Sequence, residues 1–427
     1  MTVLIAGGGI AGMSLALTCE QVGVPFRLFE SVPRIRPLGV GINLQPSAVR
    51  ELFDLGLESQ LGRIGVKTRD YGMYTKMGLH IWTEPRGTWA GYRWPQFSVH
   101  RGGLHVMLPE EVVKRAGEAC VECGWAATGF ANDGDEAVLH LRNAAGQTRV
   151  ERGRLLVGAD GIHSAIRRQI APDEGEPIWG GAVLWRGTTR ARPYKSGASM
   201  VMIGHSRLRF VAYPISAPDP ATGLATINWI ANLQYSLDAP WNKEDWNREA
   251  RLDDFLPKFE SMRFDWLDVP ALIRGAEKVY EYPMVDRDPL ERWTVGRVSL
   301  MGDAAHAAYP VGSNGAGSAI VDARKLGRAF VDHGVTPEAL AAYEAQMRPV
   351  TSKVVLTNRV AGPDQILDVV EERCGGRFDR IEDVISTQEL ADHATRYKAI
   401  AGYAVDATNS APPTIPAGAR VRGDGRG

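Results

Sequence analysis

The chain has 427 residues, a formal net charge of −1, 44% hydrophobic residues and 23% charged residues. This length exceeds that of one ordinary domain, and the composition is typical of a globular protein. The balanced charge gives no electrostatic reason to expect a nucleic acid or an anionic membrane as partner, and no apolar run reaches the ~18 residues of a membrane span.

The N-terminal segment, residues 2–30, predicts a strand, a turn, a helix and a second strand. Residues 3–6 form a short apolar run with β-branched side chains, which is typical of a buried strand. Residues 13–22 continue as a helix, and residues 25–29 predict the second strand. Because the first strand begins at once, we expect no secretory signal and a cytoplasmic protein.

Three glycines join the first strand to the helix in G-x-G-x-x-G spacing. Gly7 allows a tight turn, Gly9 lets a pyrophosphate approach the backbone, and Gly12 lets the helix pack close to the strand. The free N–H groups of the helix N-terminus favour phosphate. Glu30 ends the second strand, where an acid accepts hydrogen bonds from a ribose. The segment predicts dinucleotide binding but does not separate FAD from NAD.

The rest of the chain alternates between β-rich and helical segments. The β-rich segments are residues 66–98, 125–157 and 180–235. The helical segments are residues 46–57, 103–117, 240–275, 315–333 and 337–367. Residues 409–427 are rich in Pro, Gly and Arg and predict a mobile tail.

Two further motifs follow predicted strands. Residues 156–167, LVGADGIHSAIR, lead from a strand through a Gly/Asp turn into a helix. Residues 298–317, VSLMGDAAHAAYPVGSNGAG, repeat that arrangement. Cys120 and Cys123 have the spacing of a redox pair, but no second pair or histidine cluster accompanies them, so we expect no metal site.

With the N-terminal turn, these motifs resemble the single-component FAD-dependent aromatic hydroxylases, the class of p-hydroxybenzoate and salicylate hydroxylases. The resemblance covers residues 1–365. Smaller segments, including 36–49 and 211–216, are most similar to the class members that modify phenazine carboxylates. The resemblance implies a Rossmann-like FAD-binding domain with an inserted β-sheet substrate domain and C-terminal helices. The implied division is residues 1–72, 98–178 and 290–365 for FAD, residues 73–97 and 179–289 for substrate, and residues 366–427 for the C-terminal helices and tail.

The resemblance also implies roles for individual residues. The expected FAD contacts are Gly7, Gly9, Ile10, Ala11, Gly12, Glu30, Val40, Arg101, Asp160, Asp303, Pro310, Gly312, Gly315, Ala316 and Gly317. Gly317 stands where many members carry an asparagine, so only backbone contacts are expected there. The expected pocket walls are Trp185, Phe210, Tyr213, Trp229, Tyr282 and Tyr309. Pro310 and His306 are the candidate catalytic residues, although His306 also has an interpretation as a structural residue of its turn. Arg186 is interpreted as a surface cation rather than a ligand of a substrate carboxylate.

The implied activity is hydroxylation of a planar aromatic or N-heteroaromatic substrate, with decarboxylation as in phenazine modification. NADH or NADPH would reduce FAD, O₂ would add at flavin C4a, and the hydroperoxide would transfer OH to the ring. This chemistry needs a dry pocket and neither a metal nor a protein nucleophile. The alternatives are hydroxylation or epoxidation of another aromatic or polyketide ring, and a flavoprotein oxidoreductase that does not hydroxylate. We expect a monomer or a homodimer.

Overall fold

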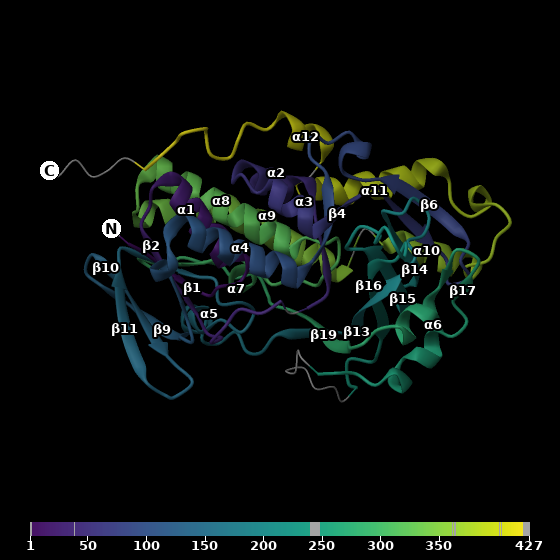
Figure 1. Ribbon diagram of the computed structural model, residues 1–427, viewed down its shortest axis with the longest axis horizontal. Coiled ribbons are helices and arrows are strands. Elements are labelled where there is room, and N and C mark those ends of the chain that lie inside the picture. The colour runs from purple at the N-terminus through teal and green to yellow at the C-terminus, as the bar shows by residue number, and fades with distance from the viewer. Residues whose placement is uncertain are drawn as a thin grey trace.

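The computed structural model describes residues 2–37, 39–239, 248–360, 362, 364–400, 402 and 404–421. A five-stranded parallel sheet forms one half of the molecule, in the order β20-β12-β1-β2-β8 (Figure 1). Its strands are β1 (Val3–Ala6), β2 (Phe26–Glu30), β8 (Val121–Cys123), β12 (Leu155–Gly158) and β20 (Val298–Leu300). The strands come from distant parts of the chain, and β1 lies between β2 and β12 with its side chains fully buried. Such runs are typical of parallel strands covered on both faces.

Helices cover this sheet and carry the turns that follow its strands. They are α1 (Ile10–Val22), α2 (Pro46–Asp54), α3 (Glu58–Ile64), α4 (Arg101–Ala116), α5 (Ala165–Ile170), α7 (Asp303–His306), α8 (Gly315–His333) and α9 (Pro337–Val360). Helices α1, α8 and α9 run together across the upper left of Figure 1. Two small sheets flank this half, and their strands are β9 (Ala126–Asp133), β10 (Glu136–Arg142), β11 (Thr148–Gly153), β3 (Gly41–Leu44), β4 (Gly65–Thr68) and β7 (Gln96–His100).

A seven-stranded sheet forms the other half, in the order β19-β13-β16-β15-β14-β5-β6. Its strands are β5 (Asp70–Tyr74), β6 (His80–Pro85), β13 (Ile178–Ala191), β14 (Ser199–His205), β15 (Leu208–Pro214), β16 (Ala225–Gln234) and β19 (Val279–Asp286). All neighbours are antiparallel except β14 and β5. The sheet thus joins an early hairpin to strands that follow it by more than a hundred residues.

The segment predicted as helical over residues 240–275 is mostly not α-helical. Residues 240–247 lie outside the described residues. The remainder forms the short turns η3 (Leu252–Asp254) and η4 (Leu256–Phe259), the two-residue strands β17 and β18 (Arg263–Phe264 and Leu267–Asp268), and one short helix, α6 (Val269–Arg274). Prolines begin η4 and α6, where the missing N–H is tolerated. Phe255 and Phe259, four residues apart, pack into the core on the seven-stranded sheet, so a spacing typical of a helix arises here from turns.

The structure of the C-terminal region differs from the prediction of a mobile tail over residues 409–427. Helices α10 (Gln365–Cys374), α11 (Thr387–Ile400) and α12 (Val405–Ser410) follow α9. Residues 411–421 then run back over the top of the molecule in Figure 1. Ile415 is 2% exposed, and the Val421 N–H donates to the Val22 carbonyl oxygen over 2.9 Å. The tail is therefore held down through residue 421, because an apolar anchor and backbone hydrogen bonds outweigh its Pro/Gly-rich composition; residues 422–427 lie outside the described residues.

A buried arginine links the helices beneath this tail. Arg324 on α8 is 0% exposed, and its guanidinium pairs with Glu51 and Asp54 of α2. It also donates to Gln21 of α1. A buried cation with this many partners holds three helices at fixed separation. None of the described helices combines the length and apolar composition needed to cross a bilayer.

Replacing Ile415 by Ala should lower the unfolding midpoint, since large-to-small changes at buried positions cost about 2–5 kcal/mol. Thermal unfolding followed by circular dichroism measures this effect, and limited proteolysis should cut the tail faster. Val360→Ala is the control, because Val360 is 79% exposed. Equal midpoints for both variants would contradict the packed tail.

Arg324→Met should destabilise the protein more than Arg328→Met, one turn along the same helix. Breaking a buried pair leaves uncompensated charge and costs about 3–5 kcal/mol. Arg328 makes an i,i+4 pair with Asp332 that is 40% exposed on both sides, and such pairs contribute about 0.5 kcal/mol. Urea unfolding of both variants compares them, and similar midpoints would refute the linking role.

Candidate active site

The glycine turn after β1 is built by close backbone approach. A Cβ on Gly12 would overlap the Gly7 carbonyl oxygen, and one on Gly7 would overlap that of Ala159. Gly7 has φ +108°, which glycine adopts without strain. A Cβ on Gly9, in contrast, would meet nothing within 4 Å. The turn is thus packed on its inner side and open on the outer side, which fits a pyrophosphate that approaches the start of α1, where Ile10 and Ala11 lie.

Glu30 is fixed beside this turn. Its Oε2 accepts the Gly8 N–H over 2.6 Å, and its Oε1 accepts the Val32 N–H over 2.9 Å. His105 of α4 lies on the same side, with its Nε2 3.1 Å from the Gly8 carbonyl oxygen. The sequence analysis missed His105, because only the fold brings α4 against the turn.

Other helix N-termini face the same region. A Cβ on Gly302 would lie 2.8 Å from the Ala11 side chain, so the exposed Asp303 begins α7 next to the start of α1. Gly315 begins α8, and a Cβ there would meet nothing within 4 Å. Ala316 and Gly317 complete the first turn of α8, whose N–H groups and dipole favour negative charge.

Asp160 and Arg167 stabilise these turns through hydrogen bonds. The Asp160 carboxylate accepts from the Ser164 hydroxyl over 2.5 Å and from the Ala165 N–H over 2.8 Å, so it caps α5. Arg167 is 1% exposed and donates to the carbonyl oxygens of Ala304 and Ala305 over 3.1 and 2.8 Å. The motif of residues 156–167 therefore holds the motif of residues 298–317 in place.

The loop between α7 and α8 is tied down through its backbone. The Asn358 carboxamide donates to the carbonyl oxygens of Tyr309 and Val311 over 3.1 and 3.2 Å, and Gln45 donates to that of Gly312 over 3.3 Å. Pro310 is exposed. Tyr309 is 7% exposed, and its ring lies over Gly180 of β13, apart from the other predicted pocket tyrosines.

The contacts of His306 fit the structural interpretation, and its catalytic role stays a prediction. Its Nε2 lies 2.6 Å from Oδ2 of Asp322, which is 0% exposed, and its ring packs against Trp293. Burial lowers the pKa of His306, but Asp322 overcomes this and raises the pKa above its ordinary value. The same carboxylate oxygen accepts the Gly302 N–H over 3.0 Å. The pair thus holds the turn before α7 in place.

Three of the predicted pocket walls belong to a closed aromatic core. Trp185, Phe210 and Trp229 are each 0% exposed. They pack together on one face of the seven-stranded sheet, and Trp185 stacks on Phe255 with ring centroids 4.7 Å apart. Because side chains alternate along a strand, residues one position away lie on the opposite face. The prediction of these three as pocket walls is therefore wrong, and aromatic content alone could not assign the face.

The opposite face carries Tyr213, Tyr282 and a polar set. Tyr213 pairs across the ladder with Asn228, and Arg186 pairs with Tyr280. Arg186 is not a surface cation: its Nη2 donates to the Gly41 carbonyl oxygen over 2.7 Å, and its guanidinium lies over the Tyr282 ring at 5.7 Å.

Gly41 follows Val40, whose carbonyl oxygen accepts the Arg101 N–H over 2.8 Å. The predicted cofactor residues Val40 and Arg101 thus meet the sheet through Gly41. The sequence signal for Arg186 and Asn228 was their position next to Trp185 and Trp229, because adjacent strand residues point to opposite faces.

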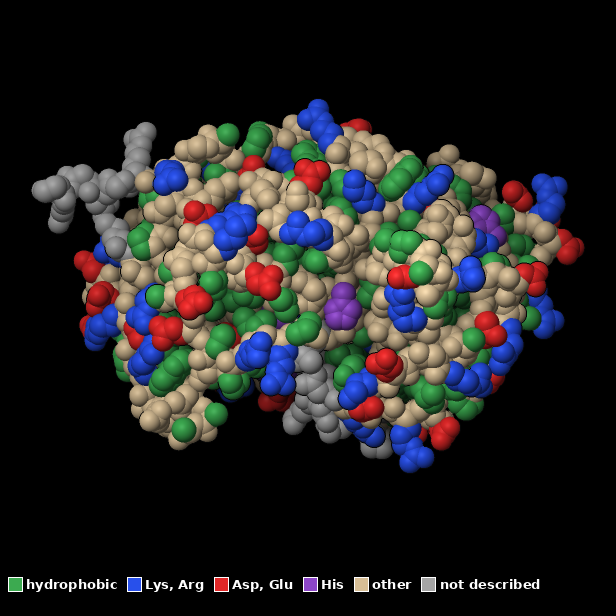
Figure 2. All heavy atoms as spheres, in the orientation of Figure 1, with side chains coloured by type: hydrophobic (Ala, Val, Ile, Leu, Met, Phe, Trp, Pro, Cys, Tyr) green, Lys and Arg blue, Asp and Glu red, His purple; other side chains and the backbone are tan. Residues whose placement is uncertain are grey.

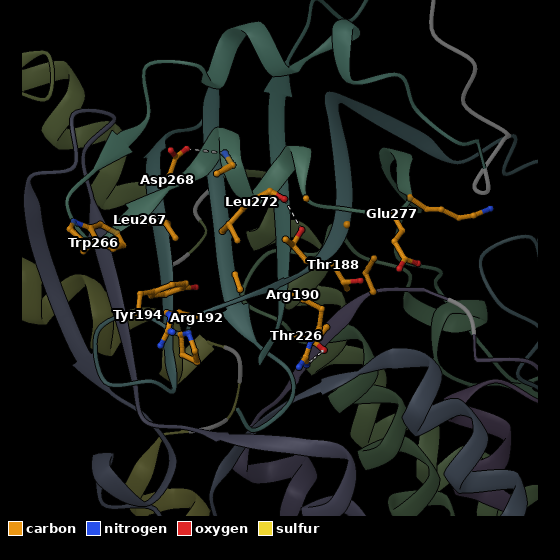
Figure 3. Close-up of a pocket in the computed structure, with 18 of the residues that line it drawn as sticks. Thr188, Arg190, Arg192, Tyr194, Thr226, Trp266, Leu267, Asp268, Leu272 and Glu277 are labelled. Carbon is orange, nitrogen blue, oxygen red and sulfur yellow. Dashed lines mark hydrogen bonds between the residues drawn. The ribbon is translucent and has the colours of Figure 1, made fainter. Parts of the chain in front are cut away.

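A hollow of about 1070 Å³ opens beside this cluster. Gly39 and Val40 line one side, and Tyr280 lies at its edge. Thr188, Arg190, Thr226 and Trp266 also line it, as Figure 3 shows. On the face shown in Figure 2, acidic and basic side chains are intermixed. Among the described residues, no group of three or more His, Cys, Asp or Glu side chains could hold a metal ion.

Comparison with known proteins agrees with this geometry. A family described as an FAD binding domain matches residues 1–358. Phenazine 1,6-dicarboxylic acid hydroxylase PhzS of Lysobacter antibioticus is 41% identical over 361 residues, which cover 84% of this chain and 89% of that protein. Salicylate hydroxylase of Pseudomonas putida is 28% identical and covers 91% and 90% of the two chains.

Solved structures share the fold. HpxO of Klebsiella pneumoniae, in complex with FAD and uric acid, matches with a TM-score of 0.73 and 22% identity over 96% of this chain and 97% of that chain. A salicylate hydroxylase substrate complex matches with a TM-score of 0.70 and 21% identity over 96% and 97%. The parallel sheet, its glycine turn and the matched family together show that this chain belongs to the FAD-dependent aromatic monooxygenases.

Proposed function

We propose that this enzyme hydroxylates a planar, fused or N-heteroaromatic carboxylate, with loss of the carboxyl group as CO₂, at the expense of NADH or NADPH and O₂. The observation that carries the proposal is the 41% identity to a phenazine dicarboxylic acid hydroxylase, combined with a polar sheet face beside the cofactor loop. Hydroxylation or epoxidation of another aromatic or polyketide ring remains the competing activity. Reduced nicotinamide is regenerated in the cytoplasm, which supports a location there. The proposed assembly is a monomer or a homodimer.

In this proposal the N-terminal half holds the cofactor. Gly7, Gly9 and Gly12 admit the pyrophosphate, Glu30 accepts from a ribose, and Asp303 accepts from the ribityl chain. Arg101 and Asp160 lie on the same side, and the first turn of α8 at Gly315–Gly317 faces the flavin. When bound, FAD supplies the redox chemistry that activates O₂ with electrons from the nicotinamide. The proposed division is residues 1–72, 98–178 and 290–365 for FAD and residues 73–97 and 179–289 for substrate.

The chain's own residues orient the substrate and exclude water. Tyr282 and Tyr213 offer ring faces on the polar side of the sheet, and burial raises the pKa of Tyr213 to about 12. Its phenol therefore stays protonated near neutral pH and serves as a hydrogen-bond donor. The aromatic core behind the sheet keeps this face rigid and dry, which a hydroxylation needs because water promotes wasteful peroxide release.

Asp303→Asn should reduce FAD retention. Hydrogen bonds to a charged partner contribute about 1.5–3 kcal/mol, so the FAD dissociation constant should rise about 10- to 100-fold. The ratio of flavin to protein absorbance after dialysis, and fluorescence titration with FAD, measure this change. Asp173→Asn, at an exposed position on the loop after α5, is the control. Unchanged FAD affinity in Asp303→Asn would remove this residue from the cofactor site.

The reaction itself is tested by substrate-dependent oxidation of NADH and NADPH. Phenazine, quinoline and hydroxybenzoate carboxylates are supplied to the FAD-loaded protein, while O₂, H₂O₂ and CO₂ are measured. The proposal predicts stimulated oxidation, little peroxide and one CO₂ per O₂ for one fused-ring acid. Coupled oxidation without CO₂ would favour simple hydroxylation, and a protein that cannot be loaded with FAD would refute the flavin chemistry.

A further inference from the structure

Three side chains from neighbouring strands converge on the backbone of Gly41. Arg186 Nη2 donates to the Gly41 carbonyl oxygen over 2.7 Å, and the Gly41 N–H donates to Asn228 Oδ1 over 2.6 Å. Tyr213 completes the group: its phenol oxygen lies near Arg186 and can accept a hydrogen bond from the guanidinium. A Cβ on Gly41 would lie 2.6 Å from Asn228 and 2.8 Å from Tyr213. The cluster is thus packed closely on the side of the cofactor loop.

Two donors of this cluster are left over. Arg186 Nε and Asn228 Nδ2 are buried, and neither has a hydrogen-bond partner. The orientation of the Asn228 carboxamide is set by chemistry, because the Gly41 N–H requires an acceptor and only the carboxamide oxygen provides one. The free end is therefore an NH₂ group. Buried donors without partners cost about 1–3 kcal/mol each, so they indicate a site that a ligand acceptor completes.

The charges around Arg186 also indicate that a ligand completes this cluster. Among the described residues, no carboxylate forms an ion pair with Arg186, whereas the fully buried Arg167 and Arg324 each pair with a glutamate. The groups that act on Arg186 are Tyr213 and Tyr282, which are neutral near pH 7, and Arg101, which is a second cation. Burial and Arg101 both lower the pKa of Arg186. A buried guanidinium is costly to keep without a counter-charge.

We propose that Arg186 and Asn228 form the subsite that binds the carboxylate of the aromatic substrate, and that they select acids over neutral analogues. A planar guanidinium matches a carboxylate, with Nε and the Asn228 amide as the free donors. The Tyr282 ring beside the guanidinium supplies a flat surface for the attached ring. This inference rests on the proposed function, since it names the substrate charge that the same site recognises.

The hydrogen bond to Gly41 gives Arg186 a second, structural role, so a simple loss of activity would not separate the two. Paired ligands do separate them. Phenazine-1-carboxylate and phenazine-1-carboxamide, and likewise salicylate and salicylamide, have the same ring and differ in charge. A carboxylate subsite affects only the acid, whereas a disturbed loop weakens the acid and the amide alike.

The experiment titrates the FAD-loaded protein with both members of each pair and follows the flavin absorbance change, or the heat of binding, without NAD(P)H. Wild type should bind one of the acids at least tenfold more tightly than its amide. Arg186→Gln should reduce this ratio to below about threefold and leave amide binding within threefold of wild type. Arg186→Lys should restore part of the ratio, because the charge remains.

Two further variants sharpen the result. Asn228→Asp keeps an oxygen for the Gly41 N–H but replaces the free NH₂ with an anion, so acid binding should fall at least tenfold while amide binding changes less. Arg207→Gln is the matched control: Arg207 is exposed and lies in the turn between β14 and β15 of the same sheet, outside the lining of the hollow. This control should leave the ratio unchanged.

A ratio near one in wild type, or a ratio that survives in Arg186→Gln, overturns the subsite. An equal loss for Arg207→Gln also overturns it, because the selectivity would then reflect long-range charge. If acids and amides bind without preference but the acid is hydroxylated with release of CO₂, the proposed function stands and the subsite falls. If neither pair binds to the FAD-loaded protein, the subsite falls together with the proposed substrate class.

Discussion

The close approach of helix α1 to strand β1 is the constraint on which the cofactor half depends. Gly12 sits against the Gly7 carbonyl oxygen, and Gly7 sits against that of Ala159, at distances that admit no Cβ. This contact aims the N-terminus of α1 across the carboxyl ends of the parallel strands. The turns after β12 and β20 end at the same edge because β12 lies between β1 and β20. Three motifs far apart in the chain therefore face one space.

Gly41 joins this half to the seven-stranded sheet. Its carbonyl oxygen and its N–H are held by Arg186 and Asn228, and the preceding residue is bonded to Arg101. A cofactor beside this loop and a ligand on the sheet would thus share one rigid backbone segment. Behind the sheet, the core around Trp185 and Trp229 fixes the strands that carry the polar residues. Precise placement of reacting groups depends on such support.

The cofactor motifs could be predicted because the residues that define each motif are close together in the sequence. The strand, glycine turn and helix of residues 2–30 lie within a few residues of the predicted positions, since glycine spacing and apolar periodicity depend on near neighbours. Strands β13 to β16 were predicted for the same reason. Most of residues 248–275 were misassigned because a spacing of four residues, as between Phe255 and Phe259, is produced equally by a helix and by turns that pack on a sheet. The tail was misassigned because composition does not report an anchor such as Ile415.

By itself the sequence determined the N-terminal strand, glycine turn and helix, and the family to which the chain belongs. Only the tertiary structure decided which face of the sheet is open and what each polar group meets. Trp185 and Arg186 are adjacent in the chain, yet one lies in a sealed core and the other beside the cofactor loop. His306 belongs to a motif, yet its partner Asp322 lies sixteen residues away and is fully buried. The physical reason is that burial and charge pairing are properties of neighbours in space, which strand register and helix packing bring together from distant parts of the chain.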